Sequence, residues 1–333
     1  MSVDHFPPFR PHPLVPGGHA QTLMGFYGRS TRFSCRAQDH QVFLEDGDGF
    51  VLHEDSAKAR GQEDRSVLLV PGLGGSSQSP VMPQIATKLN ACGFRTFRMD
   101  FRGCGSGYRL ARLPGHAGRS EDTAAAVLKI TQLYPRSLVT AVGLSMGGNI
   151  VLKMLGETGR VRLGNLDSGV AVAPPVDLLP CSLQMTRLPY RLYSHAFVRS
   201  LLQEIRRRRE FVEEMRQIPL LPRPKTLMEF DDRFTAPLSG FVDVRDYYEQ
   251  CSSGPLLPEI CLPTLVLAAA DDPLIPVSIF DRAGFSSSTN VLITNQGGHV
   301  GYFGVPGVDP DRRWMDWRIV DWIQQHHRQA KQA

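Results

Sequence analysis

Six short apolar runs, separated by stretches with helix-like composition, follow one another between residues 66 and 294, and they constrain the fold more than any other feature of the chain. They read VLLVPG, FRTFRMD, SLVTAVG, SGVAVAP, PTLVLAAADD and NVLIT, and most of them end near Gly, Pro or Asp. Continuous apolar runs are typical of strands buried on both faces, and strands that alternate with helices require right-handed crossovers between parallel neighbours. The pattern predicts a mostly parallel, doubly wound α/β sheet.

A β-hairpin is predicted just before this series. Residues 41–54, QVFLEDGDGFVLHE, place two apolar-rich runs on either side of the turn sequence DGDG. Asp-Gly pairs between such runs favour a tight turn. We therefore expect the sheet to begin with this hairpin.

The regular alternation stops between Asp177 and Pro258, which predicts a helical cap inserted into a single domain that spans residues 1–333. Residues 199–217 contain strong helix formers and no strand signal, and prolines at positions 219, 222 and 224 should end that helix. The four arginines of residues 206–209 would point in different directions and have glutamates nearby. We expect them to form a solvated helix face rather than an anion-binding patch.

Both ends of the chain are expected to pack on this core. Residues 1–40 are interpreted as an N-terminal extension. The last helix is predicted to start with Asp309 as its N-cap and Pro310 in its first turn. Its apolar residues recur at helical spacing and should be buried, and they are Met315, Ile319, Trp322 and Ile323.

A G-x-S-x-G pattern extends from Gly143 to Gly147, between the run LVTAVG and a stretch with helix composition. A serine in a sharp strand-to-helix turn needs glycine two positions before and after it, because larger side chains there would clash. Such a serine projects above the sheet at a helix N-terminus, where backbone N–H groups favour developing negative charge. Ser145 is therefore the predicted nucleophile, rather than an incidental serine in a glycine-rich turn.

A serine nucleophile needs a histidine base and a carboxylate that orients the histidine. His299 follows the run NVLIT on a loop flanked by glycines, and Asp272 ends the run LVLAAADD. The order Ser145, Asp272, His299 is that of α/β-hydrolases and not that of chymotrypsin or subtilisin. Asp271 competes for the acid position. We favour Asp272 because the sequence Pro-Leu-Ile-Pro that follows it is common after the acid of this fold.

The loop VPGLGG, residues 70–75, follows the first of the six runs and is rich in glycine, so its backbone can approach a substrate oxygen closely. A loop in this position commonly supplies one N–H group of an oxyanion hole, and the residue after the nucleophile supplies another. We therefore expect the N–H groups of Leu73 and Met146 to form the oxyanion hole.

Charge and composition argue against several other classes of function. The 37 basic and 33 acidic residues give a net charge of +4, which is too small to imply a nucleic-acid partner. No run approaches the ~18 apolar residues of a transmembrane segment, and the N-terminal residues lack a signal-peptide pattern, which predicts a cytoplasmic protein.

The cysteines, at positions 35, 92, 104, 181, 251 and 261, form no C-x-x-C pair, and the pair His12 and His19 has no suitable ligand near it in the sequence. No disulfide framework or metal site is expected.

Several stretches resemble the YheT-like α/β-hydrolases. The two segments that are specific to that group are HAQT, which ends the matching stretch HPLVPGGHAQT at residues 12–22, and FDDRFTAP at residues 230–237. Others belong to the wider superfamily, namely residues 71–75, 100–107, 143–149, 271–276 and 297–301. The turn at 100–107 is glycine-rich but lacks the G-x-x-x-x-G-K of a phosphate loop. The resemblance implies a serine carboxylesterase or acylglycerol-lipase-like activity without a cofactor, with the triad Ser145, Asp272 and His299.

These features together predict a serine hydrolase, independent of cofactor and metal, that cleaves small-molecule esters with short to medium acyl chains, or acylglycerols, through an acyl-enzyme. An acyltransferase with the same acyl-enzyme is the alternative, and a non-catalytic binding protein on this fold is a more distant one. The oligomeric state stays open. The cap should cover the strand ends. It is expected either to form the apolar wall of a site for the acyl chain or only to pack on the core. Its apolar candidates are Leu183, Met185, Leu188, Tyr190, Leu192 and Phe197.

Overall fold

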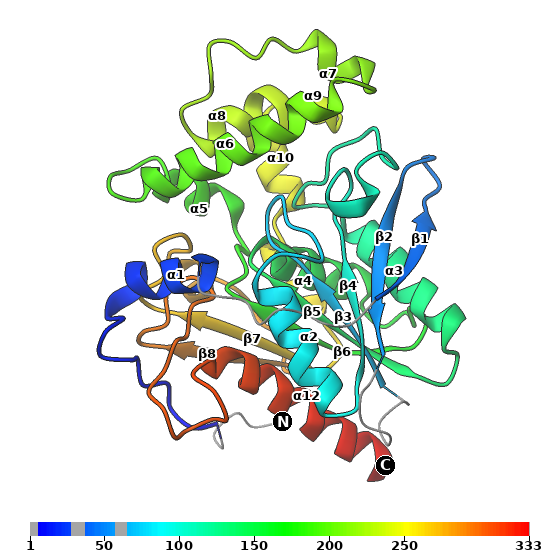
Figure 1. Ribbon diagram of the computed structural model, residues 1–333, viewed down its shortest axis with the longest axis vertical. Coiled ribbons are helices and arrows are strands. Elements are labelled where there is room, and N and C mark those ends of the chain that lie inside the picture. Colours follow the sequence, from blue (N-terminus) through cyan, green and yellow to red (C-terminus); the bar gives the residue numbers. More distant parts are fainter. Residues whose placement is uncertain (1–5, 28–36, 57–64, 333) are drawn as a thin grey trace.

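The computed structural model describes residues 6–27, 37–56 and 65–332, and an eight-stranded sheet crosses the centre of the molecule (Figure 1). The strands are β1 (Gln38–Phe43), β2 (Gly49–Asp55), β3 (Arg65–Val70), β4 (Arg95–Met99), β5 (Leu138–Leu144), β6 (Leu166–Val172), β7 (Thr264–Ala269) and β8 (Thr289–Thr294). They lie side by side in the order β1-β2-β4-β3-β5-β6-β7-β8. β2 is antiparallel to β1 and to β4, and the other neighbours are parallel.

The predicted hairpin and the six predicted strands are confirmed. β1 and β2 form the hairpin, in which Val42 lies opposite Phe50, and the six apolar runs form β3 to β8 in chain order. The prediction of a mostly parallel, doubly wound α/β sheet is therefore correct.

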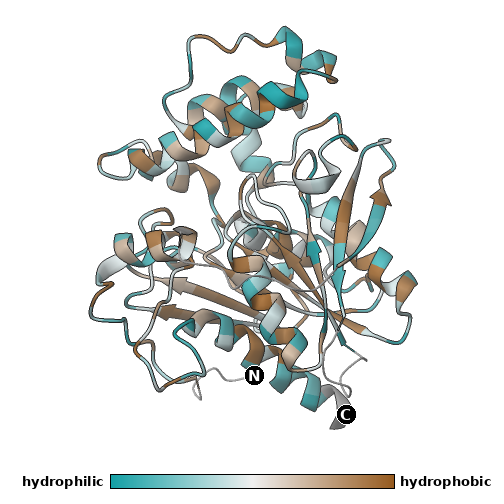
Figure 2. Ribbon diagram, viewed as in Figure 1, coloured by the Kyte–Doolittle hydropathy of each residue, from teal (hydrophilic) through white to brown (hydrophobic). Residues whose placement is uncertain are grey.

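Helices cover both faces of this sheet. Helices α2 (Val81–Ala91) and α12 (Trp314–Gln332) lie on one face, and α3 (Ser120–Leu133) and α4 (Met146–Thr158) lie on the other. In β3, Val67 and Leu69 pack with the first pair of helices, and Leu68 and Val70 pack with the second. Successive residues of a strand point to opposite faces, so a strand covered on both faces must be apolar throughout. Figure 2 shows the central strands largely in brown for this reason.

Between β6 and β7 the chain leaves the sheet and forms a layer of helices, here called the cap (residues 177–258), above the carboxyl ends of the strands (Figure 1). The cap contains α5 (Leu178–Gln184), α6 (Arg191–Arg208), α7 (Glu213–Gln217), α8 (Leu227–Phe230), the π-helix η2 (Asp231–Thr235), α9 (Ala236–Leu238) and α10 (Val244–Cys251). The 3-10 helix η3 (Gly254–Glu259) begins at its end and leads back to the sheet. Leu202 and Phe234 belong to a small apolar cluster within the cap. The cap therefore has a core of its own.

The single helix predicted over residues 199–217 is wrong in its bounds. Helix α6 begins earlier, at Arg191, and ends at Arg208, and α7 is a separate short helix. Between them the N–H groups of Phe211 and Val212 both donate to the carbonyl oxygen of Arg208, and the side chain of Val212 is buried in the cap core. The chain turns at this point and buries Val212, a tertiary contact that helix propensity alone does not show.

The expected solvated face is also wrong for one of the four arginines. Arg206 and Arg207 are exposed, but Arg208 is fully buried. Its guanidinium group donates to three successive carbonyl oxygens of residues 111–113 and lies 3.4 Å from the carboxylate of Glu204. Arg208 thereby ties the cap to the loop after the short 3-10 helix η1 (Gly105–Gly107), a contact between distant parts of the sequence.

The N-terminal extension includes one helix in the described ranges, α1 (Gly17–Tyr27), which lies beside the loop after β8. The rest of the predicted extension partly falls outside the described residues, at 1–5 and 28–36, as does Cys35. None of the helices that the structure describes combines the length and the apolar character needed to cross a bilayer.

The predicted start of the last helix at Asp309 is wrong, because α12 begins at Trp314. The Asp309 carboxylate pairs with Arg318 instead of capping the helix, and a bridge between Phe303 and Arg313 holds the preceding residues as a loop. The predicted burial of four residues on α12 is confirmed, because each of these residues is at most 1% exposed to solvent. A further short helix, α11 (Ser278–Asp281), lies between β7 and β8.

Candidate active site

Ser145 occupies the turn between β5 and α4 in a backbone conformation that residues other than glycine rarely adopt (φ 54°, ψ −121°). The flanking glycines permit this turn. A Cβ atom at Gly143 would lie 2.2 Å from the carbonyl oxygen of Gly147, and one at Gly147 would lie 2.3 Å from the carbonyl oxygen of Pro71. The turn places Ser145 at the N-terminus of α4, where the helix dipole favours negative charge.

The side chains of Ser145, His299 and Asp272 form one hydrogen-bonded chain. His299 Nε2 lies 2.8 Å from Ser145 Oγ, and His299 Nδ1 lies 2.8 Å from Asp272 Oδ2. His299 and Asp272 are buried, whereas Ser145 is half-buried. With a proton on Nδ1 donated to the carboxylate, Nε2 is free to accept the proton of the serine hydroxyl. The structure thus brings together the three residues that the sequence predicts as nucleophile, base and orienting acid.

Asp271 and Asp272 contact different parts of the histidine loop. Asp272 Oδ1 accepts two backbone N–H groups from the turn that follows it, which leaves Oδ2 for the imidazole of His299. Asp271 Oδ1 instead accepts the backbone N–H of Gly298 at 2.8 Å. Burial raises the pKa of the Asp271 carboxyl. Asp271 therefore supports the loop, and Asp272 contacts the histidine side chain.

Leu73 and Met146 both border the serine. A Cβ atom at Gly72 would lie 3.4 Å from the Cβ of Ser145, so the glycine-rich loop passes within contact distance of the serine side chain. Met146 is the first residue of α4, and the N–H groups of a first helical turn have no carbonyl partner within their own helix. Both residues line the cavity beside Ser145. The two residues predicted to form the oxyanion hole therefore border the same cavity as Ser145.

Two cavities meet at Ser145 and His299. The first, here called the cap pocket, has a volume of about 80 Å³ and is walled mainly by apolar side chains of the cap and of the loops after β6 and β7. The second, here called the α2 pocket, has a volume of about 220 Å³ and lies between α1 and the N-terminal end of α2. The serine therefore has space on two sides, as the two halves of an ester require.

Only two of the six apolar cap residues singled out from the sequence line the cap pocket, namely Met185 and Phe197. Three others are more than 40% exposed, and they are Leu183, Leu188 and Leu192. The remaining one, Tyr190, stacks on the ring of His19. Composition could not separate these groups, because the helix faces that meet the core depend on how the cap sits on the sheet.

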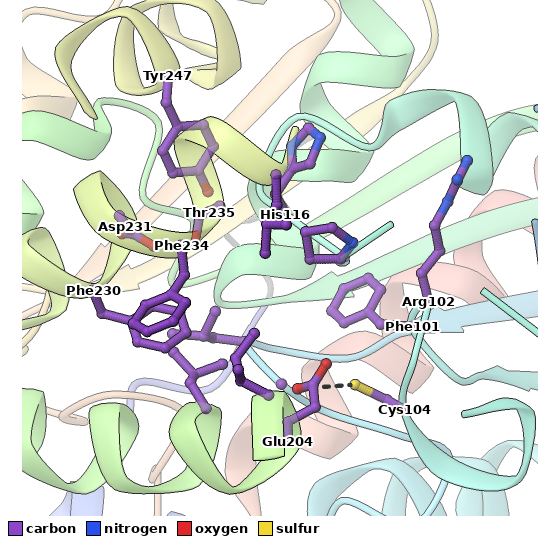
Figure 3. Close-up of a pocket in the computed structure, with 17 residues that line it drawn as sticks. Phe101, Arg102, Cys104, His116, Glu204, Phe230, Asp231, Phe234, Thr235 and Tyr247 are labelled. Carbon is purple, nitrogen blue, oxygen red and sulfur yellow. Dashed lines mark hydrogen bonds between the residues drawn. The ribbon is translucent and has the colours of Figure 1, made fainter. Parts of the chain in front are cut away.

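The motif FDDRFTAP supplies a buried carboxyl that the sequence reasoning did not single out. Asp231 lies in the π-helix η2, where Thr235 Oγ1 donates to one carboxyl oxygen at 2.7 Å and the Tyr248 hydroxyl donates to the other at 2.8 Å. Asp231 lines the cap pocket and also a neighbouring cavity of about 30 Å³, whose wall includes Glu204 and His116 (Figure 3). None of the ion pairs between described residues involves Asp231, and burial raises its pKa to about 7.

Asp231→Asn is expected to make the protein more stable at about pH 8 but not at about pH 5. An unfolded Asp ionises near its ordinary pKa of about 4, whereas folded Asp231 ionises near 7, so the wild type loses stability as the pH rises through this interval. The full cost of ionisation is up to about 4 kcal/mol, since one pKa unit corresponds to about 1.4 kcal/mol. Asn carries no charge and avoids this cost.

Urea unfolding of the wild type and the variant over this pH range measures the effect. Asp232→Asn is the matched control, because Asp232 is the exposed neighbour in the same π-helix. Equal pH dependence of stability in the wild type and Asp231→Asn would contradict the prediction.

The glycine-rich turn at residues 100–107 folds around the carboxylate of its own first residue, Asp100. Asp100 accepts the backbone N–H groups of Ser77 at 2.7 Å and Ser106 at 2.9 Å. A Cβ atom at Gly105 would lie 2.2 Å from the Asp100 carboxylate, so the turn wraps closely around this side chain. The turn has a structural role. In the described part of the chain no group of three or more His, Cys, Asp or Glu side chains is arranged to hold a metal ion.

The sequence and the fold are similar to those of known proteins. The alpha/beta hydrolase fold family matches residues 65–304. The chain is 30% identical to YheT of Escherichia coli (strain K12), which has a provisional esterase name, over 92% of this chain and 89% of that protein. It is 28% identical to a phospholipase of Mus musculus, over 78% of this chain and 63% of that protein. A solved esterase structure from Pyrococcus furiosus has a TM-score of 0.56 and 18% identity, covering 90% of this chain and 94% of that one.

Proposed function

The chain belongs to the alpha/beta hydrolase fold family and, within it, to the YheT-like group, and from this premise we propose that it hydrolyses carboxylic esters with Ser145 as the nucleophile. The observation that carries the proposal is the continuous contact from Ser145 Oγ through His299 to Asp272, with 2.8 Å at each step. Labelling with a fluorophosphonate probe, followed by peptide mapping, tests the proposal. The adduct is expected on Ser145.

The contacts of the three side chains suggest the course of the reaction. Ser145 Oγ attacks the ester carbonyl carbon while His299 Nε2 takes the hydroxyl proton, and Asp272 stabilises the resulting imidazolium. The N–H groups of Leu73 and Met146 bind the oxyanion. When the tetrahedral intermediate collapses, the C–O bond to the alcohol breaks and His299 returns the proton to the departing oxygen. Water then attacks the acyl carbon while His299 accepts its proton. When the second tetrahedral intermediate collapses, the bond between that carbon and Ser145 Oγ breaks, His299 returns the proton to Oγ, and the carboxylic acid is released. No cofactor enters these steps.

The cap pocket is proposed as the acyl site, and the cap as its lid. The wall of the cap pocket is largely apolar. It includes Leu178, Met185 and Leu227 from the cap together with Leu274 and Ile275 after β7. The α2 pocket would then receive the alcohol. Relatives that are named as a phospholipase and as a monoacylglycerol lipase support an acyl ester of a lipid alcohol as the substrate class.

Met185→Trp is expected to shift the preference of the enzyme toward shorter acyl chains. The larger side chain narrows the cap pocket, and each methylene that no longer fits loses about 0.8 kcal/mol, or about fourfold in kcat/KM. The activity on acetate esters should change little, because the triad is untouched. A panel of esters of graded acyl length measures the effect.

Leu192→Trp is the matched control for this substitution, since Leu192 is 67% exposed on α6 and does not line the pocket. It should leave the chain-length profile of the wild type unchanged. If Met185→Trp lowers activity equally on short and long esters, the acyl chain binds elsewhere.

A further inference from the structure

Helix α1 carries the motif HAQT (residues 19–22) and touches the loop of His299, a contact that the proposed reaction does not use. The two backbones approach closely at two glycines of the loop. A Cβ atom at Gly298 would lie 2.3 Å from the carbonyl oxygen of Gly18, and one at Gly301 would lie 2.2 Å from the carbonyl oxygen of Gln21. In Figure 1, α1 lies below the cap at the side of the molecule where β7 and β8 end.

Thr22 bonds directly to the backbone of the histidine. Its hydroxyl donates to the carbonyl oxygen of Gly18 at 2.7 Å and accepts the backbone N–H of His299 at 2.9 Å. Thr22 and His299 are both buried, so water does not replace a lost bond at this N–H. A buried N–H without a partner is costly, and the loop would have to move to satisfy it.

Gln21 holds the same loop further along the chain. Its side-chain oxygen accepts the backbone N–H of Phe303 at 2.7 Å, and its amide donates to the carbonyl oxygens of Phe303 and Val15. The loop needs such support because Val300 and Tyr302 have positive φ values of 51° and 45°. Residues other than glycine adopt these conformations only where surrounding contacts over-determine them.

Helix α1 also contacts the cap. His19 Nδ1 lies 2.9 Å from the hydroxyl of Tyr193 on α6, and the two rings are stacked. The ring of Phe26 stacks over His299, with centroids 6.2 Å apart, and also contacts Phe197 on α6 edge to face. Helix α1 is therefore held between the cap and the histidine loop.

We propose that α1 is a positioning element of the active site, in which Thr22 and Gln21 hold the backbone of the histidine loop so that His299 Nε2 stays within hydrogen-bonding distance of Ser145. The inference rests on the proposed catalytic role of His299. Thr22 touches neither the nucleophile nor the substrate space, and it acts through His299. This assigns a role to the HAQT motif, although the motif is far from the three triad residues in the sequence.

Thr22→Val tests this role, because it keeps the shape of the side chain and removes the hydroxyl. We expect kcat on a short ester to fall by about tenfold to hundredfold with KM little changed, since a displacement of about 1 Å at a reacting group has effects of this size. The rate of fluorophosphonate labelling at Ser145 should fall in parallel. Thr22→Ser keeps the hydroxyl and should restore kcat to near the wild-type value.

Thr131→Val is the matched control. The Thr131 hydroxyl donates to the carbonyl oxygen of Val127 and accepts the backbone N–H of Asn165, so it makes the same pair of bonds as Thr22 but between α3 and the loop before β6. The substitution should lower the melting temperature about as much as Thr22→Val and leave kcat unchanged. A fall in kcat that tracks the loss of stability in both variants would overturn the inference.

Two further outcomes separate this inference from the proposed function. If His299→Ala abolishes hydrolysis while Thr22→Val and Thr22→Ser both match the wild type, the positioning role is wrong and the triad stands. If Thr22→Val does not fold, Tyr193→Phe takes its place, because it removes only the hydroxyl that contacts His19. That variant should lower kcat in the same direction by a smaller factor, and an unchanged kcat would count against α1 as a positioning element.

Discussion

Ester hydrolysis is expected to fall by about five to six orders of magnitude in kcat when Ser145 is replaced by Ala, with the fold intact. The hydroxyl of Ser145 is the group in contact with His299 Nε2, and its removal leaves the base with no nucleophile to activate. Ala has a Cβ atom like Ser, so the strained turn at φ 54° is equally accessible to it. What activity remains would come from the binding of the ester and from the oxyanion hole alone.

The steady-state rate on a short ester and the extent of fluorophosphonate labelling measure the effect of Ser145→Ala. Ser286→Ala is the control, because the hydroxyl of Ser286 bonds to Thr289 at the start of β8 and has no contact with the triad. Its activity and labelling should match those of the wild type. Labelling of the wild-type enzyme at a residue other than Ser145 would refute the assignment of the nucleophile.

Asp272→Asn is expected to lower kcat by about four orders of magnitude. The oxygen of the new amide would remain on the two backbone N–H groups that Asp272 Oδ1 now accepts, so its NH₂ group would face His299 Nδ1. The imidazole would then carry its proton on Nε2. In that tautomer it donates to the hydroxyl of Ser145 and cannot accept the serine proton.

Asp271→Asn is the neighbouring control and should cost far less. Its amide oxygen can still accept the N–H of Gly298, the contact that Asp271 makes in the structure. Measurements of kcat for the two variants over the same pH range compare them, and circular dichroism checks that both are folded. A larger loss for Asp271→Asn than for Asp272→Asn would move the acid to Asp271.

The strands and the serine turn were predictable because the physics that determines them is local. A strand covered on both faces must be apolar at successive positions, as in β3, and this pattern is visible in any short window of sequence. The turn at Ser145 excludes a Cβ atom at Gly143 and Gly147, so its steric requirement leaves a five-residue pattern. Chain order, the positions of Asp272 and His299 after predicted strands, and the sequence that follows Asp272 then suggested the acid and the histidine.

Tertiary contacts decided the rest, since they join residues that no sequence window contains. Asp271 and Asp272 are neighbours in the sequence, yet Asp271 contacts the backbone of Gly298 and Asp272 contacts the His299 ring, a difference that depends on where the loop after β8 lies. Arg208 is buried because three carbonyl oxygens from another loop surround it, although its neighbours on the same helix are solvated. Thr22 reaches His299 across 277 positions of sequence. Periodicity and turn sterics therefore determined the elements, whereas burial and hydrogen bonding between distant segments determined which side chains meet.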